Sequence, residues 1–403
     1  MRVIALAGPG LPAQEMIAGG IALTRVELDR RITSSVRPLP AFFRARFARL
    51  IGMDPNAIIL PAVPARGLDR LRHPFRRSLE LAAHVRRVGP WAAAVAGAAP
   101  ETDVFQTEAL PALPVVRAAA HRVGGRFVYD FADYQTEAAR IARLPRLLRA
   151  FVRRREHGWT REAAGVLAVS EPMADLVVER FRVARPGVLL NCSPAWLPEE
   201  TTPPVATRIR DALGLAQGRQ IVLHHGQFKP GRGIEELLAA ADEPALRAID
   251  PAIVLLGYGR LWPVLDEAAR QRSGRVYVLP AAPPEALLDW VASADVCYLG
   301  VPPVTLNQRI TIPNKLFEAL MAGVPVIAAR GTEQARVIEQ EGVGRTADIT
   351  SAGELAAAIV ALLVMPKSER QALRQHCRTL GLTRYSWELR SAPLVDLYRR
   401  LAI

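Results

Sequence analysis

The sequence predicts an α/β protein of two successive domains, each built on a mainly parallel sheet. Short apolar runs alternate with longer amphipathic stretches, which is the pattern of parallel strands joined by crossover helices. The 403 residues suffice for two domains, since a domain takes roughly 100–200 residues. A Pro- and Thr-rich stretch without periodicity, residues 192–207, separates two such series and is typical of an interdomain linker.

The individual elements follow from buried apolar runs and from helical periodicity. A ligand would bind in a cleft between the two domains, as is usual for such pairs. The strands expected in the first half are Val3–Ala7, Ala57–Leu60, Val104–Gln106, Arg126–Asp130, Gly165–Val169 and Val188–Asn191, with helices at Leu79–Val88 and Leu110–Val123. Those expected in the second half are strands Gln220–His225, Ala252–Leu256, Arg275–Leu279, Asp295–Gly300 and Pro325–Ala328, with helices Ile234–Ala241, Leu261–Ser273, Pro284–Ala292 and Asn314–Ala322.

The basic charge of the chain is concentrated in its first half. The formal net charge is +13, and residues 1–200 alone hold 29 Arg against 19 Asp and Glu, a net of +10. Residues 41–51, 71–77 and 147–155 interleave aromatic residues with arginines. A helix of that composition can lie at an anionic membrane surface, so we expect a peripheral membrane contact. The alternatives are aromatic residues packed in the core beneath a solvated basic face, or arginines that grip a lipid-diphosphate acceptor.

Other features restrict the compartment and the partners. The three cysteines Cys192, Cys297 and Cys377 are far apart and odd in number, which fits neither a disulfide framework nor a metal knuckle. We therefore expect a cytoplasmic protein, at most peripheral on the inner face of the plasma membrane, without a bound metal. No apolar run approaches the roughly 18 residues of a spanning helix. Nucleic acid is not expected as a partner, because no recognised binding module accompanies the charge.

The segment Ile312–Ala329 has the pattern of a short helix followed by a buried strand. Pro313 stands where the helix would start, Gly323 where it would end, and Pro325 begins the next apolar run. Glu318 differs from the rest, since it is an acid among apolar neighbours. Its spacing leaves two interpretations open, a solvated helix position or a binding residue.

A glycine-rich loop follows the first strand expected in the second half. His224–Leu238 reads HHGQFKPGRGIEELL. Gly226, Gly231 and Gly233 allow positive φ and close backbone approach, and the helix after them offers free N–H groups to an anion. No Gly-Lys-Ser/Thr sequence occurs, so this is not a Walker loop. The alternative interpretation is an ordinary surface turn.

Together these two segments resemble the donor site of glycosyltransferase family 4. Residues 313–326, Pro-Asn-Lys-Leu-Phe-Glu-x-Leu-x-Ala-Gly-x-Pro-Val, are similar to the family's donor-site motif. Residues 224–238 are similar to its strand, glycine-rich loop and helix. The resemblance implies a GT-B fold, in which two Rossmann-like domains face each other across a cleft. It also implies a nucleotide-diphospho-sugar as co-substrate, with no other cofactor.

The resemblance also implies roles for individual residues. Glu318 would accept hydrogen bonds from the ribose hydroxyls, which suits a carboxylate facing two vicinal donors. Arg232 would hold the donor diphosphate and stabilise the charge that develops on it. Lys229 would replace the arginine that many members carry at the position of Gln227. The other expected donor-binding residues are Gly226, Gly257, Gly259, Leu279, Asn314 and Lys315, with Gly19 and Gly20 in a stretch, residues 15–28, that resembles the family's first loop and helix.

The sequence departs from the family at two places. Ile310 stands where many members carry a glutamate that binds the donor sugar, and we expect Asn307 in the loop 305–311 to supply a polar group instead. On the first-half loop where many members carry a histidine, this chain offers Asp133. The expected catalytic residues are therefore Arg232, Asp133 and Asn307. His224 and His225 close a strand, and their contact with donor or acceptor is left open.

The resemblance implies a retaining, metal-independent, hexosyltransferase-like enzyme. Its domains would be residues 1–195 on the acceptor side, residues 196–380 on the donor side, and a helical segment 381–403 packing back on the first domain. The acceptor would be a lipid-linked or polysaccharide precursor or a small molecule. Two alternatives remain: a non-catalytic sugar-nucleotide-binding or scaffold protein, suggested by Ile310 and the missing histidine, and a sugar-nucleotide epimerase on the same fold.

Overall fold

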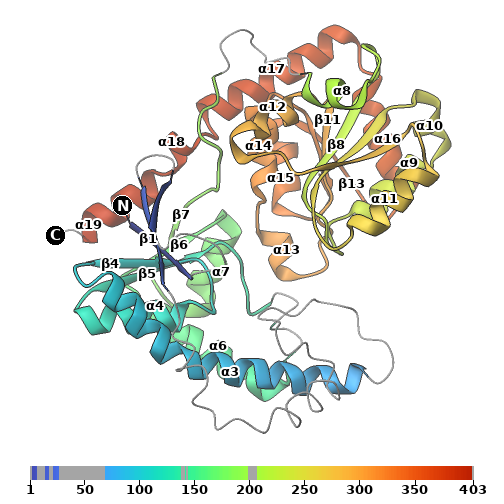
Figure 1. Ribbon diagram of the computed structural model, residues 1–403. Helices are drawn as coiled ribbons and strands as arrows, with labels where there is room; N and C mark the ends of the chain where they lie inside the picture. The colour runs from blue at the N-terminus through green and yellow to red at the C-terminus, as the bar shows by residue number, and fades with distance from the viewer. Residues whose placement is uncertain are drawn as a thin grey trace. The chain divides into compact units, whose positions relative to one another are not determined.

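The computed structural model describes residues 2–6, 14–17, 21–26, 69–137, 141, 144–197 and 207–401. These residues divide into two compact units, and the chain passes between the units more than once (Figure 1). Unit 1 takes its described residues from Met1–Leu167, Leu176–Pro186 and Leu397–Ile403, and unit 2 from Ala168–Asp175 and Gly187–Asp396.

Unit 2 is built on a six-stranded parallel sheet in the order β10-β9-β8-β11-β12-β13. The chain adds strands toward one edge from β8 to β10 and then toward the other edge from β11 to β13, so the direction of winding reverses between β8 and β11. All five strands expected in the second half are present, and β13 is an addition. The strands are β8 (Ile221–Gln227), β9 (Ala252–Tyr258), β10 (Val276–Pro280), β11 (Val296–Leu299), β12 (Val326–Ala329) and β13 (Gly344–Ala347).

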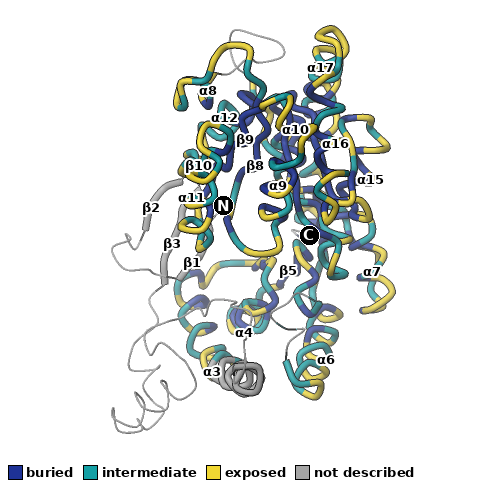
Figure 2. The backbone as a smooth tube through the Cα atoms, turned by 90° about the vertical axis from the view of Figure 1, so that its right-hand side faces the viewer, coloured by how far each residue is buried: buried dark blue, intermediate teal, exposed yellow. Residues whose placement is uncertain are grey.

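The two faces of this sheet support two separate apolar cores. On β8, Ile221 and Leu223 belong to one core and Val222 to the other, because successive side chains of a strand point to opposite faces. Leu316 and Leu320 of α14 cover the first core. Nearly all residues of the central strands are buried, which explains why they read as continuous apolar runs (Figure 2).

The helices of unit 2 lie on both faces of the sheet (Figure 1). Helices α8, α12, α14, α15 and α17 contribute to the first core, and α9, α10, α11 and α16 to the second. The bounds are α8 (Arg208–Leu213), α9 (Ile234–Ala241), α10 (Pro244–Ile249), α11 (Trp262–Gln271), the 3-10 helix η1 (Pro284–Ala286), α12 (Leu287–Ala292), α13 (Leu306–Ile310), α14 (Asn314–Met321), α15 (Glu333–Glu341), α16 (Ala352–Leu363), α17 (Lys367–Thr383) and α18 (Trp387–Arg390).

The strands of the first half form two small sheets. The expected runs appear as β1, β4, β5 and β6, and the last run shortens to β7, while the expected strand Ala57–Leu60 lies outside the described residues. One sheet has the order β4-β5-β6-β7, and the other has the order β1-β3-β2. The strands are β1 (Arg2–Leu6), β2 (Gln14–Ile17), β3 (Ile21–Val26), β4 (Val104–Thr107), β5 (Arg126–Phe131), β6 (Gly165–Ala168) and β7 (Gly187–Val188).

The last helix of the chain, α19 (Ala392–Leu401), ends within unit 1. Its Leu397 packs on Gly165 of β6 so closely that a Cβ atom there would touch the leucine methyl groups. The hydroxyl of Tyr398 donates a hydrogen bond of 2.9 Å to Oε1 of Gln106 on β4. The other helices of the first half are α3 (Asp69–Ala98), α4 (Leu113–Val123), α6 (Arg146–Glu162) and α7 (Glu171–Phe181).

Two local expectations were wrong. The stretch 15–28, expected as a loop and a helix, instead contributes strands β2 and β3. The β-branched residues Ile21, Thr24 and Val26 favour an extended backbone, and β3 pairs with both β1 and β2. The expected loop 305–311 contains helix α13, because Thr305 and Gln308 form a capping box.

None of the described helices is both long enough and apolar enough to cross a membrane.

Candidate functional site

The candidate site lies in unit 2, at the carboxyl ends of β8 and β11. In an open α/β sheet, ligands bind outside the carboxyl ends of the strands where the winding direction reverses, which here is between these two strands. The glycine-rich loop and the start of α9 follow β8, and the start of α14 lies beside the same edge (Figure 1). Both segments that the sequence singled out therefore meet at one edge of the sheet.

Two glycines allow the loop to pack against its neighbours. Gly233 precedes α9 with a φ of +71°, and a Cβ atom there would overlap the carbonyl oxygen of Gly300 after β11. Gly226 has a φ of +111°, and its missing side chain leaves room for Lys315. A residue with a side chain at either position would be strained and would collide with a neighbour. These glycines hold the loop against the reversal point of the sheet.

The carboxylate of Glu318 is paired with His225. Nε2 of His225 lies 2.7 Å from Oε2 of Glu318, and the two side chains are 4% and 17% exposed. Burial lowers the pKa of His225, and the hydrogen bond with Glu318 offsets part of that effect. The imidazole is therefore a neutral N–H donor, and Glu318 is a largely buried, hydrogen-bonded carboxylate instead of a solvated helix residue.

Lys315 interacts electrostatically with this carboxylate and with two further cations, Arg232 and Lys229. The pKa of Lys315 is lowered to about 8, mainly by burial and secondly by the nearby charge of Arg232, while the charge of Glu318 acts in the opposite direction. Lys229 repels the same ammonium group. Several cations held so close together indicate a site for a multivalent anion. The first turn of α14 adds backbone N–H groups, since its N-cap Pro313 provides no side-chain cap.

His224 points away from Glu318. Its Nδ1 lies 3.3 Å from the carbonyl oxygen of Tyr298 on β11. The pKa of this imidazole lies well below its usual range, mainly because the ring is buried and secondly because of the charge of Lys315. His224 is therefore neutral and buried in the core. It faces the opposite side of the sheet from His225, because neighbouring residues of a strand alternate between the two faces.

The other residues expected at the donor site lie on nearby elements. Gly257 pairs in register with Gly226 across β8 and β9, and Gly259 follows β9 with a φ of +143°. Leu279 lies on β10, Asn314 opens α14, and Asn307 lies on α13, where its carbonyl accepts a hydrogen bond from Thr311. Gly19 and Gly20 lie outside the described residues. The donor-binding and catalytic roles expected for all these residues stay predictions.

In unit 1, Asp133 follows β5 and is exposed, whereas Asp130 lies on the strand itself. Asp130 is 9% exposed on β5, and Nε2 of Gln106 donates to its Oδ2 at 3.3 Å. The pKa of Asp130 is raised to about 6, mainly by burial and secondly by the charge of Glu108. The chain from Tyr398 through Gln106 to Asp130 links three distant segments, so sequence reasoning missed it.

Unit 1 also buries Glu156, a glutamate that the sequence did not single out. Glu156 of α6 is 1% exposed, and the hydroxyl of Tyr129 on β5 donates to its Oε1 at 3.1 Å. Burial raises the pKa of Glu156 to about 7. The only sequence signal was an acid in a strongly basic helix.

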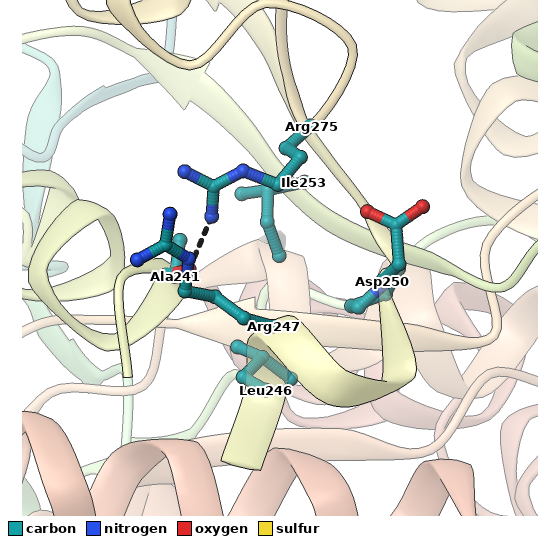
Figure 3. A pocket seen from close by; sticks show the side chains of 7 residues that line it. Ala241, Leu246, Arg247, Asp250, Ile253 and Arg275 are labelled. Atoms are coloured by element: carbon teal, nitrogen blue, oxygen red, sulfur yellow. Dashed lines mark hydrogen bonds between the residues drawn. The ribbon is translucent and has the colours of Figure 1, made fainter. Parts of the chain in front are cut away.

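A small pocket occupies the opposite edge of the unit 2 sheet. It lies near the amino ends of β9 and β10, between Ile253 and Arg275, where Arg275 donates to the carbonyl of Ala241 at 2.9 Å (Figure 3). Its volume of about 10 Å³ is far below the roughly 300–1,000 Å³ of a small-molecule site. This pocket is therefore not a candidate for the ligand site.

Over the described ranges, no three His, Cys, Asp or Glu side chains gather in a metal-binding group. The expectation that no metal is bound stays a prediction.

Comparison with known proteins finds a family match within unit 2. Residues 219–364 match the family model described as Glycosyl transferases group 1. This range contains the glycine-rich loop, His225, Lys315 and Glu318. No curated protein sequence matches the chain.

Solved structures with the same fold cover most of the chain. Sucrose-phosphate synthase from Thermosynechococcus elongatus is 17% identical with a TM-score of 0.67, over 100% of this chain and 88% of that chain. An α,α-trehalose-phosphate synthase (UDP-forming) from Burkholderia xenovorans is 13% identical with a TM-score of 0.65, over 99% and 91%. Anabaena Alr3699/HepE, in complex with UDP and glucose, is 17% identical with a TM-score of 0.61, over 77% and 81%. The chain thus has the GT-B fold, and this fold and the domain match together support a GT-B glycosyltransferase.

Proposed function

We propose that the protein is a retaining glycosyltransferase of the family 4 kind, which moves a sugar from a nucleotide-diphospho-sugar to an acceptor. The observation that carries the proposal is the meeting of one carboxylate, Glu318, with the cations Lys315 and Arg232 at the carboxyl end of β8. A nucleoside diphosphate has the complementary pattern, with two neutral hydroxyl donors on the ribose and a multivalent anion next to them. The group 1 domain match covers this whole constellation.

Each chemical part of the donor binds a different group of residues in the site. The ribose binds Glu318, and the diphosphate binds Arg232, Lys315 and Lys229, together with N–H groups of the loop and of α14. Backbone groups near Leu279 hold the base, and Asn307 binds the donor sugar. HepE holds UDP and glucose, which makes a uracil nucleotide the first candidate.

The transfer step uses the leaving diphosphate itself. As the bond between the anomeric carbon and the phosphate oxygen breaks, the acceptor oxygen forms its bond to the anomeric carbon from the same face. The departing phosphate oxygen accepts the proton of that acceptor hydroxyl, so configuration is retained. Arg232 and Lys315 stabilise the charge on the departing diphosphate, which is the work that preorganised cations do well. This scheme requires no metal. Asp133 would orient the acceptor.

A screen of nucleotide binding tests the proposal. UDP, GDP, ADP and TDP are compared by thermal shift, and the tightest-binding one (the probe nucleotide) is titrated calorimetrically into the parent and into Glu318→Ala. The substitution should weaken binding by about ten- to a hundredfold, the usual value of a charged hydrogen-bond partner. The matched control is Glu267→Ala on α11, which removes an exposed carboxylate paired with Arg270 and should leave binding unchanged. Equal affinity of the parent and Glu318→Ala would remove the ribose assignment.

Turnover distinguishes the enzyme from the alternatives. Release of the probe nucleotide from its sugar conjugate supports a transferase. Binding without release would favour the sugar-nucleotide-binding or scaffold protein, and loss of the sugar's original stereochemistry without transfer would favour an epimerase.

We further propose a peripheral contact with anionic membrane through α6. Leu147 is 85% exposed and Phe151 46% exposed on this helix, and the guanidinium carbon of Arg155 lies 5.2 Å from the Phe151 ring centroid. Near an anionic surface each basic residue contributes about 1 kcal/mol, and inserted apolar side chains add a part that resists salt. Such a contact would hold a cytoplasmic enzyme at the inner face of the plasma membrane, next to a lipid-linked acceptor. The inserting residues Phe42, Phe43 and Phe47 expected from sequence lie outside the described residues.

Liposome sedimentation over a salt series tests the membrane contact. Anionic vesicles should bind the protein at low salt and neutral vesicles should not, and Leu147→Ser with Phe151→Ser should remove the salt-resistant part. The control Val264→Ser changes an exposed apolar residue of α11 and should have no effect. If neither type of vesicle binds the protein at low salt, the basic half serves the acceptor or solubility.

A further inference from the structure

A buried histidine holds one oxygen of the Glu318 carboxylate. His225 is near the end of β8, and its Nε2 lies 2.7 Å from Oε2 of Glu318 on α14, 93 residues away in sequence. The imidazole is 4% exposed. Among the residues that the structure describes, His225 is the hydrogen-bond partner of this carboxylate.

The surroundings of the ring fix which nitrogen carries the proton. Nδ1 of His225 is buried without a hydrogen-bond partner in the described part of the chain. A buried N–H group without a partner is costly, whereas a buried lone pair costs less. Nε2 faces a carboxylate and must therefore be the donor. The neutral, Nε2-protonated imidazole is thus a permanent donor to Glu318.

A purely structural role does not account for this residue. The strand positions before the two histidines are Ile221, Val222 and Leu223, all fully buried. An apolar side chain would fill the same space without the cost of desolvating an imidazole. His225 also does not reach a ligand through Nε2, because that atom is engaged by Glu318. Its effect on a ligand must pass through the carboxylate.

We propose that His225 is a positioning residue that makes the site selective for ribose hydroxyls, since it holds Oε2 of Glu318 and leaves Oε1 directed to the ligand. The inference rests on the proposed binding of a nucleotide at Glu318. Without the imidazole, the carboxylate could rotate toward Lys315, whose charge attracts it. The site would then keep its affinity for diphosphate and lose its preference for the sugar hydroxyls.

The test compares the probe nucleotide with its 2′,3′-dideoxy counterpart by calorimetry. The measured quantity is the ratio of the two Kd values, which reports on the hydroxyls alone. The parent should prefer the ribose form by about tenfold or more, and His225→Leu should reduce that ratio by about fivefold or more. His225→Gln restores an N–H donor near the position of Nε2 and should keep most of the preference. The control His224→Leu removes the neighbouring buried imidazole, which bonds Tyr298 instead of Glu318, and should leave the ratio unchanged.

A double substitution separates positioning from a general loss of structure. In a Glu318→Gln background, His225→Leu should change the ratio no further, because both substitutions act through one carboxylate. Nitrogen NMR of the parent gives a second measurement that does not depend on any variant folding. It should show a neutral His225 protonated on Nε2, and a ring protonated on Nδ1 overturns the inference.

Failure of the positioning role and failure of the proposed function give different results. If the parent binds the probe nucleotide and His225→Leu weakens both forms equally, the positioning role is overturned while the proposed function stands. If the parent binds none of the four nucleotides, the proposed function fails, and the selectivity of the site fails with it.

Discussion

A Cβ atom on Gly226 would lie 2.8 Å from Cε and 3.0 Å from Nζ of Lys315. The bare backbone at the end of β8 therefore makes room for the buried ammonium group, whose charge interacts with those of Arg232 and Glu318. Since Gly226 also has a φ of +111°, both the backbone and the space require a glycine. This relationship explains why a glycine stands at this position near the end of β8.

Gly226→Ala should displace the Lys315 side chain and weaken binding of the probe nucleotide by about tenfold. The strained backbone should also cost about 1–3 kcal/mol of stability. Gly214→Ala is a matched control, because Gly214 has a φ of +62° but open space around it. It should lose stability without losing nucleotide affinity. Equal nucleotide affinity of Gly226→Ala and the parent, measured by calorimetry, would contradict a role for the Lys315 position.

Arg232→Ala should weaken binding of the probe nucleotide by about ten- to a hundredfold and binding of the matching nucleoside by about twofold at most. The reason is that the proposed function assigns the guanidinium group to the diphosphate and not to the base or ribose. Arg247→Ala, beside the small pocket at the opposite sheet edge, is the control. An equal loss for nucleotide and nucleoside would place Arg232 away from the phosphates.

Nucleotide binding should weaken as the pH rises above about 8. The pKa of Lys315 is lowered to about 8, so the free site loses its ammonium charge above that pH. A bound diphosphate favours the charged form and raises the pKa of Lys315 in the complex. Binding should therefore take up a proton, and affinity should fall by at most about tenfold per pH unit.

Calorimetry between about pH 7 and 9.5, in buffers of different ionisation enthalpy, measures this uptake above the range in which the nucleotide phosphate titrates. Lys315→Met should bind more weakly with a flat pH profile. A sloping profile in that variant would assign the proton to another group.

Glu156→Gln should flatten the pH dependence of the stability of unit 1. The pKa of Glu156 is raised from 4.5 to about 7 in the folded chain. Above the unfolded pKa the unfolded chain ionises first, so stability is fully present below about pH 4.5 and is lost as the pH rises toward 7. A shift of that size corresponds to about 3 kcal/mol.

Urea unfolding at several pH values, compared between the parent and Glu156→Gln, measures that loss, and Glu101→Gln controls for removal of an exposed carboxyl group. Asp130, with a pKa of about 6, should leave a residual slope of the same sign in the variant. Parallel curves for the parent and Glu156→Gln would contradict the titration of Glu156.

Sequence reasoning was most accurate where local pattern determines structure. The segment from Pro313 to Pro325 has its helix at Asn314–Met321 and its strand at Val326–Ala329, close to the expected bounds. Reasoning was least accurate over residues 15–28, where the resemblance suggested a helix. There the β-branched residues and two strand partners determined the outcome.

The sequence by itself determined the alternation of strands and helices, the glycine-rich loop and the odd acid at position 318, because each depends on neighbours within one or two turns of chain. Only the tertiary structure decided that His225 donates to Glu318 and that Lys315 lies under Gly226. Those contacts join residues about ninety positions apart. They depend on strand order, which brings β8 beside β11 and near the start of α14. The lowered pKa values of Lys315 and His225 likewise arise from burial and from nearby charges, which exist only once the sheet has formed.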